Sequence, residues 1–189
     1  VINNLTKSAG VFFIKTIYSI LLCILCLLFN ADFPFIPIQI TLIDAVIEAF
    51  PAFFMSFEKN DTKCEKSFLQ TALRSALPNG IAVVVCCAIL LVLSRYSGIE
   101  SAQSSLLMYL SVGFISLAGV IKASLPFNLL RGFLALSSVL GFIFAVALFS
   151  NLLQLPQLSL TGTVILLPIT AIGIILALCI KLPRLKTVG

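Results

Sequence analysis

Six long apolar runs separate the short polar segments of this chain, and they constrain its fold more than any other feature. Only 10% of the residues are charged, whereas a soluble domain carries about 25%. A helix of about 20 apolar residues crosses a bilayer with its backbone hydrogen bonds satisfied. We therefore predict an all-α membrane protein, a bundle of six transmembrane helices. The predicted spans cover residues 11–29, 33–57, 81–93, 102–124, 129–153 and 161–180.

The most charged stretch of the chain divides these spans into two groups. We predict that residues 1–57 form a transmembrane hairpin and that residues 58–77 form a charged cytoplasmic loop. Residues 78–189 are then a four-helix transmembrane region, whose first span is expected to open at Pro78. The chain begins without a positively charged leader, so we expect no signal peptide and a piece of a longer protein.

The basic residues are distributed unevenly between the two ends of the predicted bundle. With a cytoplasmic N-terminus, every Lys and Arg except Arg95 falls on the cytoplasmic side, where positive charges concentrate in membrane proteins. We therefore expect both termini to be cytoplasmic. The net charge of +5 then reflects membrane topology, and it does not indicate binding to nucleic acid.

The second span carries two carboxylates, Asp44 and Glu48, between Pro37 and Pro51. Four residues apart, they lie on one face of a helix. A charge at the bilayer centre costs roughly 2.5–3.5 kcal/mol, so two charges on one turn need a partner or a function. The pair indicates a cation site, and the alternative is a buried polar cluster that ties helices together.

Several neutral oxygen donors accompany the two acids. Calcium and magnesium prefer oxygen ligands such as carboxylates, hydroxyls and backbone carbonyls. Pro51 breaks the helix by removing a backbone hydrogen bond, which frees carbonyls. Thr41 in the same span, and Thr16 and Ser19 in the first span, offer hydroxyls as candidate ligands. The alternative for the hydroxyls of Thr16 and Ser19 is a bond to a carbonyl of their own helix.

Lys15 places a positive charge within the first span. A lysine there either extends its ammonium group to the cytoplasmic edge or acts as an internal counter-ion for the carboxylates. The sequence leaves both readings open.

Other metal and catalytic chemistry is poorly supported. The chain contains no histidine, which excludes a histidine-bound zinc and a His-based catalytic triad within it. Five of its six cysteines lie in apolar runs, where a thiol behaves as a small hydrophobic group. We assign no catalytic residue to this chain.

Two short motifs stand at a characteristic spacing: Ile2-Asn3-Asn4 leads into the first span, and residues 35–39 and 44–51 follow in the second span. These motifs and their spacing resemble the C-terminal membrane half of P-type cation-transporting ATPases, calcium pumps in particular. The resemblance covers essentially the whole chain as transmembrane helices five to ten. It is greatest for the bacterial branch related to calcium pumps, whose fifth helix often has a pair such as Lys15-Thr16.

This resemblance implies a set of cation ligands and a departure from calcium pumps. Asp44 falls on an asparagine ligand and Glu48 on an aspartate ligand of those pumps. Thr16 falls on an asparagine ligand, and Ser19 on a glutamate ligand. The fifth helix here therefore contributes no acid, so the resemblance implies one divalent ion, or another cation, in place of two calcium ions.

The resemblance also implies partners that lie outside the sequence. ATP and magnesium would bind only in missing cytoplasmic domains, since no Asp-Lys-Thr-Gly-Thr phosphorylation motif occurs here. The implied partners are those domains, the first four helices of the same polypeptide and the lipid bilayer. The implied location is a bacterial plasma membrane, and the implied cargo is calcium or magnesium.

Two other functions are compatible with the composition. The chain can be a fragment of a secondary cation transporter or channel, or a non-catalytic membrane scaffold. An inverted repeat would favour a secondary transporter, but only one span carries acids.

Overall fold

The computed structural model describes residues 2–57 and 68–180, and all regular structure in these ranges is helical. Six units within them are long and apolar enough to cross a membrane, which confirms the predicted all-α bundle. One of the six is composite, because α2, η1 and α3 follow one another without a gap. The elements are α1 (Ile2–Phe29), α2 (Pro37–Ile43), η1 (Asp44–Ala49), α3 (Phe50–Ser56), α4 (Phe68–Ser97), α5 (Ser101–Ala123), α6 (Leu129–Leu148) and α7 (Leu160–Cys179).

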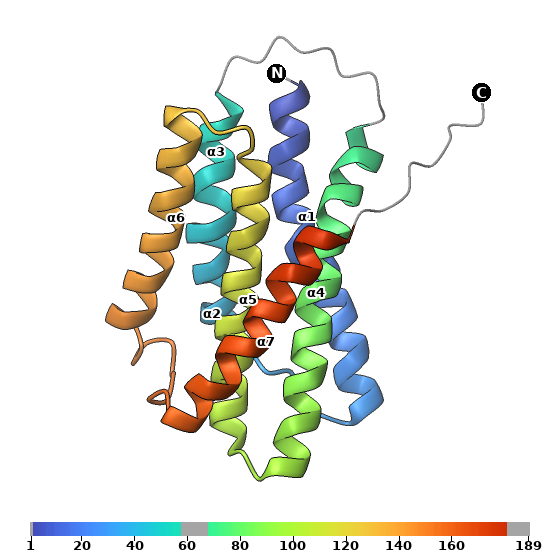
Figure 1. Ribbon diagram of the computed structural model, residues 1–189, viewed down its shortest axis with the longest axis vertical. Helices are drawn as coiled ribbons and strands as arrows, with labels where there is room; N and C mark the ends of the chain where they lie inside the picture. Colours follow the sequence, from blue (N-terminus) through green and yellow to red (C-terminus); the bar gives the residue numbers. More distant parts are fainter. Residues whose placement is uncertain (1, 58–67, 181–189) are drawn as a thin grey trace, which may run out of the picture.

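Successive spans run in opposite directions (Figure 1). Helices α1, α4 and α6 begin at one end of the bundle, and the α2–η1–α3 unit, α5 and α7 return to that end. Lys122 in the last turn of α5 and Arg131 in the first turn of α6 lie at this end. Arg95, in the last turn of α4, lies at the opposite end. The cytoplasmic placement of the termini stays a prediction.

Helix α5 forms the centre of the bundle. Residues are buried over 83% of its span, compared with 33% for α6 and for α7. Helix α4 packs against α1, α5 and α7, and α6 packs against α3 and α5. The α2–η1–α3 unit therefore lies between α1 on one side and α5 and α6 on the other.

Helix α4 begins at Phe68, well before the expected opening at Pro78. Residues 68–77 are thus helical, whereas the sequence suggested that they belong to the charged loop. Small residues explain the extension, because Ala72, Ala76 and Gly80 lie along α4 where it packs against α1. A Cβ atom on Gly80 would lie 2.9 Å from Cβ of Ile17. Close packing of this kind keeps a helix intact through an internal proline.

Candidate functional site

The backbone changes its pitch at the two acids. Residues Asp44–Ala49 form a π-helical turn, and the N–H of Phe50 donates to the carbonyl of Ala45. Pro51 has no N–H to donate to the carbonyl of Ile47, so an ordinary helical bond is missing at this point. The sequence predicted a helix broken at Pro51, and the irregular turn lies directly before this proline, after which α3 continues through it. Such π-turns are frequent at functional sites.

Glu48 is the most deeply buried acid among the described residues. Its side chain is 1% exposed, and neither carboxylate oxygen has a hydrogen-bond partner within residues 2–57 and 68–180. The turn that carries it contacts α1, α5 and α6. Burying a polar group without a partner is costly, so a carboxylate in this position points to a ligand that satisfies it.

Asp44 lies one turn away and is paired. The ammonium group of Lys15 on α1 forms an ion pair with Oδ2 of Asp44, and both side chains are about one-third exposed. The other carboxylate oxygen, Oδ1, is buried and has no partner within the described ranges. Lys15 therefore occupies the position of an internal counter-ion, one of the two roles left open above.

The three hydroxyl candidates differ in position. Thr16 is exposed and its hydroxyl donates to the carbonyl of Phe12 at 3.5 Å. Thr41 is also exposed, and its hydroxyl donates to the carbonyl of Pro37 at 2.9 Å. Ser19 is half-buried on α1. The structure therefore brings Lys15, Asp44 and Glu48 together, and it leaves Thr16 and Thr41 on the outer surface of this bundle.

Hydrogen bonds hold the acid-bearing unit in register with its neighbours. The hydroxyl of Ser8 on α1 donates to the carbonyl of Ala52 at 3.1 Å, one helical turn beyond Glu48. At the other end of the unit, the side-chain amide of Gln39 donates to the carbonyl of Leu153 at 2.8 Å. These bonds hold the unit that carries Glu48 between α1 and the segment that joins α6 to α7. They are specific to tertiary packing, so the sequence carries no local signal for them.

Tyr18 is the residue near the acids that sequence reasoning missed. Its side chain is 0% exposed, and its hydroxyl has no hydrogen-bond partner among the described residues. Tyr18 follows Lys15 by three positions, so both lie on one face of α1. That spacing was the available signal, but a tyrosine in an apolar run reads equally well as core.

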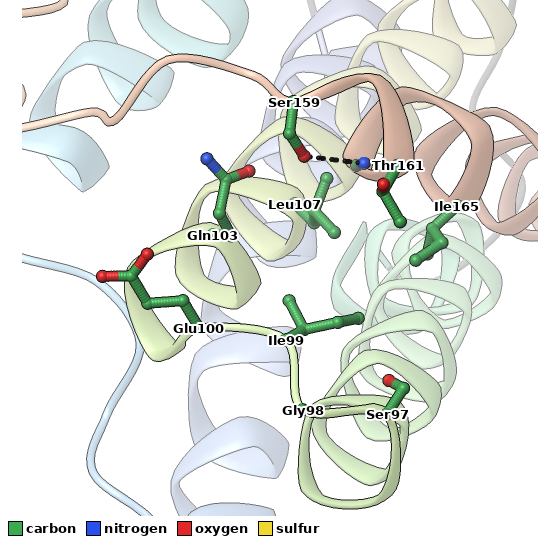
Figure 2. A pocket seen from close by; sticks show the side chains of 10 residues that line it. Ser97, Gly98, Ile99, Glu100, Gln103, Leu107, Ser159, Thr161 and Ile165 are labelled. Atoms are coloured by element: carbon green, nitrogen blue, oxygen red, sulfur yellow. Dashed lines mark hydrogen bonds between the residues drawn. The ribbon is translucent and has the colours of Figure 1, made fainter.

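A separate cavity of about 210 Å³ lies between the α4–α5 turn and the start of α7 (Figure 2). Two of its polar side chains take part in local structure. The hydroxyl of Ser159 accepts the N–H of Gly162 at 2.9 Å and so caps α7. The amide of Gln103 donates to the carbonyl of Gln157 at 2.5 Å. None of the predicted cation ligands lines this cavity.

Within the part of the chain that the structure describes, no three His, Cys, Asp or Glu residues gather into a metal site. An ion at the acid pair would therefore need neutral oxygens as further ligands, a donor set that suits a hard cation and not a soft one. Six membrane-spanning helices around an intramembrane acid pair define the class of this protein: a polytopic helical membrane protein with the features of an ion-transport site.

Comparisons with known proteins identify the family within that class. The chain is 39% identical over 167 residues, 84% of its length, to the probable cation-transporting ATPase exp7 of Streptococcus pneumoniae. It is 28% identical over 190 residues, 92% of its length, to the calcium-transporting ATPase CtpE of Mycolicibacterium smegmatis. CtpE of Mycobacterium tuberculosis is 27% identical over the same share of the chain. No family model matches the chain.

The chain spans between 21% and 24% of the length of these relatives. Its six apolar helices fit the C-terminal membrane region of such an ATPase. The chain therefore belongs to the P-type cation-transporting ATPases as part of their membrane region, which confirms the resemblance found in the sequence.

Proposed function

We propose that this chain supplies the transport site of an ATP-driven cation pump in a bacterial plasma membrane. Asp44 and Glu48 are the acidic ligands of one hard divalent cation. The observation that carries this proposal is Glu48, a fully buried carboxylate on a π-turn with both oxygens unpartnered within the described ranges. A buried structural acid would be expected to have a hydrogen-bond donor, as most buried polar groups do.

The charges near the site support a single divalent ion. Asp44 and Glu48 together carry two negative charges when ionised, and Lys15 offsets one of them through its pair with Asp44. The remaining negative charge is on Glu48, where one divalent cation meets less repulsion than two would. Calcium and magnesium both suit carboxylate oxygens. Relatives named calcium-transporting ATPases favour calcium as the cargo.

The remaining ligands come from neutral oxygens. Carbonyls of the π-turn and the hydroxyl of Ser19 lie on the elements that carry the charged residues. Thr16 and Thr41 are on the outer surface here, so they join the site only where another part of the pump packs against that surface. In the proposed pump, ATP and magnesium act in cytoplasmic domains outside this chain, together with the first four helices of the same polypeptide.

The test is Glu48→Gln in the full-length protein. This substitution keeps the size of the side chain and removes its charge. We expect cation-dependent phosphorylation by ATP, and calcium uptake into vesicles, to be lost while membrane insertion is unchanged. Glu100→Gln is the matched control, because Glu100 is exposed and lies directly before α5, in the turn that joins α4 to α5. Unchanged cation dependence in Glu48→Gln would remove Glu48 from the site and with it the proposed function.

A further inference from the structure

Two tertiary contacts fix the height of α1 relative to the acid-bearing unit. The two run antiparallel, with Ser8 bonded to Ala52 and Lys15 paired with Asp44. Glu48 lies between Asp44 and Ala52 in the sequence, so it lies at a level between Lys15 and Ser8 on α1. These two contacts therefore mark the level of Glu48 along α1.

Tyr18 lies on the side of Lys15 away from Ser8 and is placed to reach back toward this region. It follows Lys15 by one helical turn on the same face, and long side chains on a helix lean toward its N-terminus. The lean carries the phenol from the level of Tyr18 back toward Lys15 and Glu48.

Four buried polar atoms on Tyr18, Glu48 and Asp44 lack partners among the residues that the structure describes. They are the Tyr18 hydroxyl, both oxygens of Glu48 and Oδ1 of Asp44. Tyr18 and Glu48 are 0% and 1% exposed. A phenol oxygen has lone pairs that can bind a cation, as a carboxylate has. One cation among these atoms would satisfy all three groups at once.

We propose that the Tyr18 hydroxyl is a further ligand of the transported cation, so that the site is an Asp44–Glu48–Tyr18 oxygen cluster selective for a hard cation. This inference rests on the proposed function, because it assumes that Glu48 binds the cargo. It gives α1 a ligand oxygen that is neutral, because a tyrosine side chain carries no charge into the membrane.

The test compares Tyr18→Phe with Tyr109→Phe in the full-length pump. Each substitution removes one hydroxyl and keeps the ring. Tyr109 is the matched control, since its hydroxyl is also fully buried and unpartnered within the described ranges. Its ring packs against Phe35 and Phe142 at centroid distances of 6.4 and 6.0 Å.

We expect Tyr18→Phe to raise the calcium concentration for half-maximal phosphorylation roughly tenfold, which corresponds to about 1.4 kcal/mol. The maximal level at saturating calcium stays the same. A second readout needs no turnover: calcium raises the unfolding temperature of a protein that binds it. That rise should be smaller in Tyr18→Phe, while the unfolding temperature without calcium matches the wild type.

The outcomes separate this inference from the proposed function. If Tyr18→Phe behaves like Tyr109→Phe while Glu48→Gln loses its calcium response, Tyr18 is no ligand and the proposed function stands. An equal loss of affinity in both tyrosine variants would show a packing effect and would also overturn the inference. If Glu48→Gln keeps the wild-type response, the proposed function fails whatever Tyr18 does.

Discussion

Lys15 and Asp44 determine how much uncompensated charge this bundle holds near its acid pair. Their ion pair is partly exposed, and exposed pairs contribute little to stability. Its importance is electrostatic, because an ammonium group next to a cation site repels the cation that the acids attract. We therefore expect Lys15 to set an upper limit on affinity for the cation and to assist its release in the proposed pump.

Replacing Lys15 with methionine tests this role. We expect Lys15→Met to lower the calcium concentration for half-maximal phosphorylation by about tenfold, since the variant removes a repulsive charge close to the ion. Direct calcium titration of the purified full-length pump measures the change. Lys122→Met is the control, because the ammonium group of Lys122 donates to the carbonyl of Ala177 at the end of α7. Equal affinities in the two variants would contradict the assigned role of Lys15.

The acid pair was predictable from the sequence because four-residue spacing on a helix requires no tertiary information. The positions of the hydroxyls were not. Thr16 and Thr41 each bond to a carbonyl four residues earlier, an alternative that every helical threonine has. Which side of α1 faces the bundle depends on close packing against α4, where Gly10 lies beside Ser75, and the sequence of α1 alone does not specify that side.

At the scale of the element, the π-turn is the feature that positions the acids. The helix is wider at this turn than an α-helix, and the turn lies directly before Pro51, which has no backbone N–H to donate. The turn rotates the residues before it relative to those after it. Glu48 thereby points into the bundle while α3 continues in the direction of α2.

Pro51→Ala restores the missing N–H and allows an ordinary helical bond to Ile47. We expect the π-turn to relax toward an α-helix and the half-maximal calcium concentration to rise by about tenfold or more, as happens when the support of metal ligands is altered. Pro168→Ala is the matched control, because Pro168 lies within α7, away from the acids. Phosphorylation titrations on the full-length pump measure both. A normal response in Pro51→Ala would show that the turn does not depend on the proline.

The first residue of α4 is an element boundary that the sequence did not predict. Pro78 and the polar residues before it suggested a loop, yet α4 runs from Phe68 through Pro78 without a break. Local propensity opposes a helix at this proline, and packing of small residues against α1 overrides it. The same residues, Ala72, Ala76 and Gly80, would be unremarkable in any apolar run.

For the whole molecule, the number of spans was predictable and their packing order was not. Bilayer thickness sets the length of an apolar run regardless of neighbours. The buried face and the lipid-facing face of a membrane helix do not differ in hydrophobicity, since lipid is as apolar as the core. Leu129 is 95% exposed and Leu160 is 88% exposed, although both look like core residues in the sequence. The central position of α5 therefore needed the structure.

The close contact between α4 and α5 predicts a stability effect. A Cβ atom on Gly119 would lie 1.9 Å from Nδ2 of Asn79 and 2.7 Å from Cδ1 of Ile14. Overpacking of this kind costs typically about 1–3 kcal/mol, so we expect Gly119→Val to lower the unfolding temperature of the full-length protein in detergent by several degrees. Gly132→Val is the control, because a Cβ atom on Gly132 has no neighbouring atom within 4 Å. That control should unfold close to the wild type, and similar losses in both variants would rule out the contact as the cause.

Helices α1 and α4 are longer than a membrane requires. With 28 and 30 residues, they measure about 42 and 45 Å, whereas the hydrocarbon core is about 30 Å thick. Both begin at the same end of the bundle (Figure 1) and pack against each other. We expect their surplus length to form a two-helix stalk at that end. Because α1 runs unbroken from Ile2 to Phe29, a domain bound to such a stalk would act through a single helix on Lys15 and Tyr18, beside the acid pair.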